Sequence, residues 1–226
     1  TTHMAYEPER PFVENGETDG IRKDLQRYHY TVAASLDRTK GKIGCLPEER
    51  LMELRKLADV LLIEADGAKR LPLKVPGEWE PVIPEFAEVV TGVIGMDALG
   101  VPIEKSCHRP ERTAAFLEKG IEEAVTEDDI VKIAVSGNAL RKYVDKREYR
   151  VLLNKADIQG KAGAAERIAE ELEMQGVCAV WGSLQKKSYH ISECAGKKRE
   201  ENNSQIREKI VLVMLAAGNS HRFGSN

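Results

Sequence analysis

Short apolar runs alternate with segments of helical periodicity along most of the chain. The apolar runs predict buried strands, at residues 60–67, 89–96, 150–153 and 177–181. The periodic segments predict helices, from Pro47 onward, over 110–120, from Thr126 onward and over 161–174. Because buried strands that alternate with helices are typical of parallel sheets, we expect an α/β fold with a mainly parallel, doubly wound sheet.

The two ends of the chain carry weaker signals. Residues 5–24 are polar and contain proline and glycine, which predicts loop or irregular structure. Short strands are expected at 28–34 and 41–46. Residues 192–209 are charged and polar and are interpreted as a linker, after which an apolar run from Ile210 predicts a further strand.

Composition limits the class of protein. The formal net charge of the 226 residues is −3, so no basic field favours nucleic acid as a partner. The longest apolar run, residues 210–217, is far shorter than the roughly 20 residues of a membrane-spanning helix. The four cysteines are far apart and include no C-x-x-C pair, which favours reduced thiols in a cytoplasmic protein over a zinc site or a disulfide framework.

The most specific local motif follows the third apolar run. Residues 154–157 read N-K-A-D, and ligands bind beyond the carboxyl ends of the strands in parallel sheets. In P-loop GTPases an N-K-x-D sequence at this position reads guanine. Asp157 would accept hydrogen bonds from the base, Lys155 would lie along it, and Asn154 would brace the loop. Four common polar residues can also follow a strand by chance, but the position after a buried strand favours nucleotide binding.

A second candidate follows the first apolar run. Glu64 and Asp66 stand where carboxylates hold Mg²⁺ in nucleotide-binding proteins, and Gly67 would let the backbone approach a phosphate. Taken alone, this segment fits a solvated acidic turn equally well. Together with the N-K-A-D motif, it favours a nucleotide site.

The residues that come next are basic. Lys69, Arg70 and Lys74 carry charges that suit a phosphate or another anion. They suit an exposed basic loop equally well, and the sequence leaves both interpretations open.

These segments resemble the YqeC family. The match runs in order through residues 64–74 (E-A-D-G-A-K-R-L-P-L-K), 80–84 (E-P-V-I-P), 95–100 (G-M-D-A-L-G), 108–111 (H-R-P-E) and 154–157. It covers nearly all of residues 1–191. The resemblance implies a P-loop-type nucleotide-binding fold and a role in maturing selenium-dependent molybdenum hydroxylases. It also makes His108 and Arg109 candidates for ligand contact, although a packing motif at a helix start explains them equally well.

The printed sequence departs from the family at its start. YqeC-like proteins carry a G-x-G-G-K-T-type loop before the segment that here includes Thr1, Thr2 and His3, which are further candidates for ligand contact. No G-x-x-x-x-G-K-[ST] occurs elsewhere in the chain. Since the backbone N–H groups of such a loop cradle the phosphates, we expect this chain by itself to be inactive. We also expect a central strand of the sheet to be missing and stability to be lowered.

A second resemblance lies at the other end. Residues 215–224 (L-A-A-G-N-S-H-R-F-G) resemble the opening of nucleotidyltransferases, including the molybdenum cofactor cytidylyltransferases. This implies a phosphate-binding turn, formed by Gly218, Ser220, Arg222 and Gly224. We therefore expect three parts: a YqeC-like domain at 1–191, a linker at 192–209, and the truncated start of a nucleotidyltransferase-like domain at 210–226.

The leading hypothesis is a nucleotide-binding maturation factor that prefers GTP to ATP. Asp157 and Asn154 would read the base, while Glu64 and Asp66 would hold Mg²⁺. A molybdenum hydroxylase or its cofactor would be the partner. One alternative is a non-catalytic partner-binding module with a vestigial nucleotide site. The other is a regulatory domain of a molybdenum cofactor cytidylyltransferase.

Overall fold

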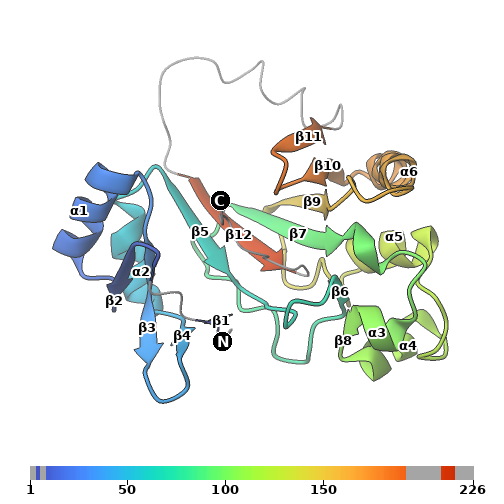
Figure 1. The fold of residues 1–226 in the computed structure, drawn as a ribbon, viewed down its shortest axis with the longest axis horizontal. Coiled ribbons are helices and arrows are strands. Elements are labelled where there is room, and N and C mark those ends of the chain that lie inside the picture. Colours follow the sequence, from blue (N-terminus) through green and yellow to red (C-terminus); the bar gives the residue numbers. More distant parts are fainter. Residues whose placement is uncertain (1–3, 6–8, 192–209, 217–226) are drawn as a thin grey trace.

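The computed structural model describes residues 4–5, 9–191 and 210–216. Its strands form a six-stranded sheet at the centre of the molecule, a four-stranded sheet near the amino end and a two-stranded pair (Figure 1). The six-stranded sheet has the order β11-β10-β9-β7-β12-β5. Its members are β5 (Val60–Glu64), β7 (Val89–Gly95), β9 (Glu148–Asn154), β10 (Cys178–Ser183), β11 (Ser188–Ile191) and β12 (Ile210–Ala216).

Neighbouring strands of this sheet are parallel, apart from the antiparallel pair β10–β11. The four apolar runs of the sequence form β5, β7, β9 and β10, so the expectation of a mixed α/β fold with a mainly parallel sheet is confirmed. Gly95 at the end of β7 lies opposite Asn154 at the end of β9. The carboxyl ends of these strands therefore meet at one edge of the sheet.

β12 lies inside the sheet, between β5 and β7 (Figure 1). Met214 is opposite Glu64 on β5, and Ala216 is opposite Val93 on β7. A strand with two parallel neighbours suits a continuous apolar sequence such as I-V-L-V-M-L-A. The expectation of a missing central strand is therefore wrong, because this late segment fills the position. That residues 210–226 open a second domain stays a prediction.

Helices cover the sheet beside β9 and β10. α6 (Ala162–Met174) packs against β10, and α5 (Glu127–Val135) packs against α6. α5 begins with a capping box, as its sequence predicts: the amide of Asp129 donates to Thr126 Oγ1 (3.2 Å), and the amide of Thr126 donates to Asp129 Oδ2 (2.9 Å). α2 (Glu48–Arg55) starts directly after Pro47, also as predicted.

The first part of the chain is more regular than its composition predicts. It forms the four-stranded sheet, with the order β1-β4-β3-β2. Its members are β1 (Met4–Ala5), β2 (Phe12–Glu14), β3 (Val32–Asp37) and β4 (Lys42–Gly44). Helix α1 (Thr18–Tyr28) lies between β2 and β3, so the expectation of irregular structure over 5–24 is wrong. Ile21 is the residue that α1 buries. With one buried position, the segment has little apolar periodicity, and the sequence gives little sign of the helix.

Short elements gather beyond the carboxyl edge of the six-stranded sheet. They are β6 (Leu73–Lys74), the 3₁₀ turn η1 (Met96–Ala98), α3 (Ile103–Ser106), β8 (Cys107–His108) and α4 (Pro110–Leu117). β6 and β8 pair in parallel and place Lys74 opposite His108. The amide of Gly95 donates to the carbonyl of Pro72 (2.9 Å), which attaches this layer to the end of β7.

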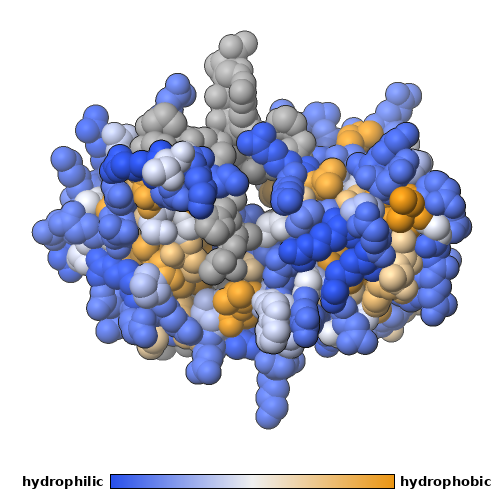
Figure 2. Space-filling model, turned by 90° about the horizontal axis from the view of Figure 1, so that it is seen from below, coloured by the Kyte–Doolittle hydropathy of each residue, from blue (hydrophilic) through white to orange (hydrophobic). Residues whose placement is uncertain are grey.

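The face of the molecule drawn in Figure 2 is mainly hydrophilic, with hydrophobic side chains gathered to the left of the middle and on the right. None of the helices in the described part of the chain combines the length and the apolar character needed to cross a membrane. Cys45 and Cys107 are free thiols, but Cys178 is disulfide-bonded, so the expectation of reduced thiols is wrong at that position.

Candidate functional site at the carboxyl edge of the sheet

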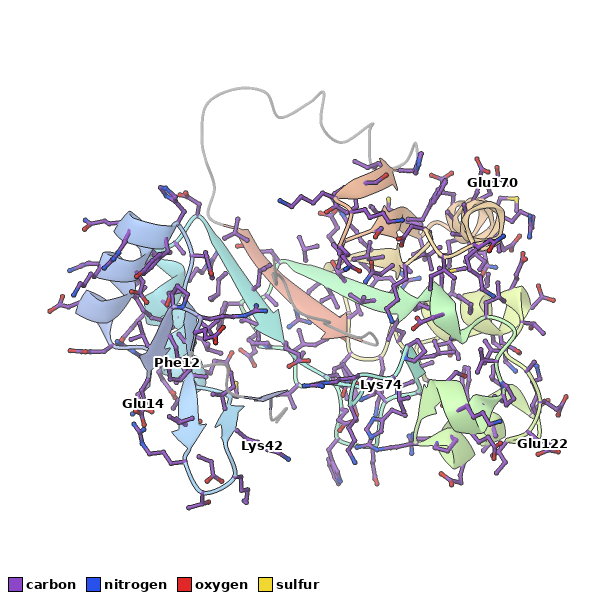
Figure 3. All side chains as sticks on the ribbon, in the orientation of Figure 1. Phe12, Glu14, Lys42, Lys74, Glu122 and Glu170 are labelled. Atoms are coloured by element: carbon purple, nitrogen blue, oxygen red, sulfur yellow. The ribbon has the colours of Figure 1, made fainter. Side chains whose placement is uncertain are left out.

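A buried lysine lies at the centre of the candidate site. Lys74 is labelled in Figure 3, in the segment that passes below the ends of β5 and β12. Its Nζ donates to Asp66 Oδ1, to the carbonyl of Gly67 (2.9 Å) and to Glu80 Oε2 (3.2 Å). The side chains of Lys74 and Asp66 are only 1% and 2% exposed. An ammonium group has three N–H donors, and all three are engaged here, so Lys74 holds the loop together rather than facing an external anion.

Glu80 joins this lysine to the start of α4. Arg109 donates to both carboxylate oxygens of Glu80, at 2.6 and 2.8 Å, and the amide of Gly77 donates to Oε2 (3.1 Å). A Cβ atom at position 77 would lie 2.4 Å from Arg109 Nη1, so glycine leaves the space that the guanidinium fills. The sequence reasoning missed the role of Glu80, although the residue belongs to the E-P-V-I-P motif. We call Asp66, Lys74, Glu80 and Arg109 the buried charge network.

Burial and neighbouring charges move the pKa values of these carboxyls in opposite directions. Burial raises the pKa of Asp66 to about 6, against the opposing effect of Lys74. Burial also raises the pKa of Glu64. Burial alone would raise the pKa of Glu80, but the hydrogen bonds from Arg109, Gly77 and Lys74 outweigh it and lower that pKa. The network therefore holds Glu80 as a carboxylate and leaves Asp66 close to its protonation point near neutrality.

His108 lies beside the network. Burial lowers its pKa, and the positive charges of Lys74, Arg109 and Lys69 lower it further. Its Nδ1 is buried and has no hydrogen-bond partner within the described residues. The imidazole is therefore neutral near pH 7, with one ring nitrogen left for a ligand or water.

The remaining basic candidates are at the surface. Lys69 and Arg70 are exposed and adopt positive φ angles of 50° and 67°. They thus form the outer turn of the loop whose inner side is the buried charge network. Two groups of candidates lie outside the described residues, namely Thr1, Thr2 and His3, and Gly218, Ser220, Arg222 and Gly224.

The N-K-A-D loop is braced by two contacts with the loop that follows β10. Asn154 Oδ1 accepts a hydrogen bond from the amide of Leu184 (3.0 Å), and the amide of Ala156 donates to the carbonyl of Gly182 (2.9 Å). Asn154 itself is buried. Asn154 therefore ties the loop after β9 to the loop after β10.

The two charged residues of this loop face different neighbours. Asp157 is exposed and pairs with Lys186 at 3.0 Å, and the hydrogen bonds from Lys186 and Ser183 lower its pKa. Lys155 instead reaches across to η1, where its Nζ pairs with Asp97 Oδ2. Asp157 is therefore the carboxylate of this loop that is open to solvent.

Two carboxylates are the candidates for holding a divalent cation: Glu64, the last residue of β5, and Asp66 shortly after it. Asp66 Oδ2 is buried and has no hydrogen-bond partner among the described residues, so this carboxylate oxygen still has its acceptor capacity unused. No group of three or more His, Cys, Asp or Glu side chains in the described part of the chain is placed to hold a metal ion by itself. Mg²⁺ in nucleotide sites needs only one or two carboxylates, because phosphate and water complete its shell.

A hollow lies away from this edge. It has a volume of about 530 Å³ and lies between α5 and α6, where its lining includes Glu127, Lys132, Arg167 and Glu171. Arg167 and Glu127 pair across it at 2.6 Å. A surface ion pair lines this hollow and it contains none of the family motifs, so it is a groove between two helices rather than the candidate site.

The buried charge network coincides with a family match. Residues 1–111 match the family model described as YqeC protein. Over these residues the chain is similar to the YqeC family. All four members of the network fall inside the match, whereas the N-K-A-D loop lies beyond it.

One curated YqeC relative extends the comparison. The protein named Uncharacterized protein YqeC from Escherichia coli (strain K12) is 31% identical over 152 residues. The aligned part is 65% of this chain and 59% of the relative, so the chain spans about three fifths of that protein's length. No solved structure matches the chain. The likeness to P-loop nucleotide-binding folds and the likeness to cytidylyltransferases stay predictions.

Proposed function

We propose that the carboxyl edge of the six-stranded sheet binds a guanine nucleotide, with GTP preferred to ATP. The observation that carries the proposal is the hydrogen bond from the Leu184 amide to Asn154 Oδ1, at 3.0 Å. It fixes the N-K-A-D loop against the loop after β10 and leaves the Asp157 carboxylate exposed beside it. A base-reading loop needs this combination of a braced backbone and an accessible acceptor.

Asp157 can exchange its present partner for a base at little cost. Its ion pair with Lys186 is exposed, and exposed pairs contribute only about 0–1 kcal/mol. Guanine offers the carboxylate two donors, the ring N1–H and the exocyclic amine. Adenine presents an acceptor at N1, so its lone pair would face the carboxylate. Asp157 therefore favours guanine over adenine.

Glu64 and Asp66 would hold the Mg²⁺ ion that accompanies the phosphates. The raised pKa values of both carboxyls support this assignment, because a nearby cation would relieve the cost of ionising them. When bound, the ion supplies positive charge to the phosphate oxygens.

The similarity to the YqeC family supports a cellular role for the site. We propose that nucleotide binding serves the maturation of selenium-dependent molybdenum hydroxylases in the cytoplasm. The partner would be a hydroxylase or its molybdenum cofactor. In this role the exposed turn at Lys69 and Arg70 is available to an anionic partner group, since neither side chain has an ion pair or hydrogen bond among the described residues.

Nuclear magnetic resonance titration with GDP and ADP in the presence of Mg²⁺ tests the proposal. GDP is predicted to shift the backbone amide signals of residues 154–158 and 182–186, and ADP is predicted to leave them in place. Asp157→Ala should weaken GDP binding about tenfold or more, since hydrogen bonds to a charged group contribute about 1.5–3 kcal/mol.

Asp145→Ala is the matched control for this titration. Asp145 is also an exposed aspartate in an ion pair, with Arg147 at 3.2 Å, but it lies outside the strand ends. Its loss should leave GDP binding unchanged. If neither nucleotide shifts the loop signals of the wild-type chain, the proposal fails and the partner-binding module becomes the better account.

A further inference from the structure

The lysine of the N-K-A-D loop is anchored at its far end. Lys155 Nζ pairs with Asp97 Oδ2, which belongs to η1, the turn directly after β7. The two residues are 58 positions apart in the sequence, and their side chains are 21% and 32% exposed. The lysine stem therefore spans from the end of β9 to the end of β7.

The backbone at Lys155 shows that this position is held by its surroundings. Its φ angle is 63°, in the left-handed region that residues other than glycine seldom adopt. Such a conformation costs of order 1–3 kcal/mol and persists only where neighbouring contacts determine it. The hydrogen bond from the next amide to Gly182 supplies one such contact, and the ion pair with Asp97 supplies the other.

The carboxylate of Asp97 is confined by its surroundings. Its second oxygen, Oδ1, is buried without a hydrogen-bond partner among the described residues. A Cβ atom at Gly95 would lie 2.3 Å from that oxygen, so the glycine makes room for the carboxylate. Lys155 is thus the cation that compensates Asp97 in this part of the structure.

We propose that Asp97 is a positioning residue for base recognition. By anchoring the ammonium group, it fixes the stem of Lys155 as a wall against which the guanine ring lies, with N1–H and the amine in line with Asp157. A freely moving stem would let the ring shift away from Asp157, so guanine and adenine would bind about equally. The inference rests on the proposed function and names a residue that sets its selectivity.

A matched control exists at the start of α6. Lys161 Nζ donates to the carbonyl of Leu99 (2.7 Å), so a second lysine from the segment after β9 also ties the segment after β7. It does so without contacting Asp97 or the N-K-A-D loop. Lys161→Met therefore removes a comparable tie between the segments but leaves the stem of Lys155 anchored.

The experiment compares GDP and ADP binding in wild type, Asp97→Asn, Asp97→Glu and Lys161→Met, with the melting temperature of each variant. Asp97→Asn should lower the ratio of the ADP to the GDP dissociation constant at least fivefold, by weakening GDP binding. Asp97→Glu should restore part of the ratio. Lys161→Met should lower the melting temperature yet keep the ratio within twofold of wild type. In the ligand-free protein, Asp97→Asn should shift the amide signals of Lys155 and Ala156.

The outcomes separate this inference from the proposed function. If Asp157→Ala abolishes guanine selectivity while Asp97→Asn leaves it intact, the positioning role is wrong and base recognition stands. If Lys161→Met lowers the ratio as much as Asp97→Asn does, Asp97 merely ties two segments. If wild type itself shows no preference for GDP, both the function and the inference fail.

Discussion

At the residue scale, the carboxyl edge contains two kinds of charged group. Lys74 and Glu80 are engaged with other charges of the buried network, so they hold the loop after β5 against α4. Asp157 and Lys69 are exposed and are the groups that a ligand meets first. The network therefore supports the loop, and recognition by the exposed residues is what we propose.

The support role predicts that Glu80→Gln destabilises the protein at pH 7. Glutamine keeps the shape of the glutamate side chain but lacks its negative charge. The charged carboxylate accepts hydrogen bonds from Lys74, Arg109 and the amide of Gly77. Hydrogen bonds to charged groups contribute about 1.5–3 kcal/mol, so a loss of about 2 kcal/mol is expected in urea unfolding. Glu85→Gln is the control, because Glu85 is exposed, and it should stay close to wild type. Equal stability of the two variants would show that the network is not a support.

The same carboxyl gives a pH dependence of definite sign. The pKa of Glu80 is lowered from its ordinary value of 4.5 in the folded protein. The unfolded chain thus takes up the proton first, and the stabilisation, complete well above pH 4.5, is lost as the pH falls below it. The difference in unfolding free energy between wild type and Glu80→Gln should shrink by about 1 kcal/mol between pH 7 and pH 3.5. A difference that grows in acid would contradict the assignment.

The candidate site residues could be predicted from the sequence, but their hydrogen-bond and ion-pair partners could not. Glu64, Asp66 and Asn154 stand at strand ends because apolar runs precede them, and this is a local signal. The partners of Arg109 and Lys155 are 29 and 58 positions away. The pairing of β7 with β9 brings Lys155 to Asp97, the pairing of β6 with β8 brings the segments of Glu80 and Arg109 together, and sequence periodicity contains neither pairing.

At the element scale, elements that bury several apolar residues were predicted, and so was β5, although its Val60 and Leu62 are exposed. The strands β7 and β9 and the helix α6 bury several apolar residues each, and their patterns were recognisable. Helix α1 buries Ile21, and β6 and β8 have two residues each, so none of them leaves a period to detect.

The capping box of α5 carries a prediction at this scale. Thr126→Ala removes the acceptor for the Asp129 amide, and such changes cost about 1 kcal/mol. Thr126→Ser retains a hydroxyl and should keep most of the stability. Thermal or urea unfolding measures both variants. Serine and alanine variants of equal stability would exclude a contribution from the cap.

At the scale of the whole molecule, β12 decides whether the sheet is continuous. It pairs with β5 on one side and β7 on the other, so the ends that carry Glu64 and Gly95 are held in register through it. The site at the carboxyl edge therefore depends on a segment that is far away in the sequence.

This dependence predicts slow hydrogen exchange of the backbone amides within residues 211–216, comparable to that of β7. Val213→Pro removes an amide from the interior of the sheet and should lower the melting temperature by roughly 5 °C or more. Ile191→Pro is the control, because β11 is an edge strand, where proline is tolerated. Rapid exchange over 211–216, with no effect of Val213→Pro, would show that β12 does not belong to this sheet in solution.

The most direct test of the central claim, guanine recognition by Asp157, is a change of base specificity. Asp157→Asn replaces two acceptor oxygens with one acceptor and one amide donor. This suits xanthine, which has a carbonyl where guanine has its exocyclic amine. The account predicts that wild type binds guanosine diphosphate more tightly than xanthosine diphosphate and that Asp157→Asn reverses this order. If the variant weakens both nucleotides equally, or leaves the order unchanged, Asp157 does not read the base.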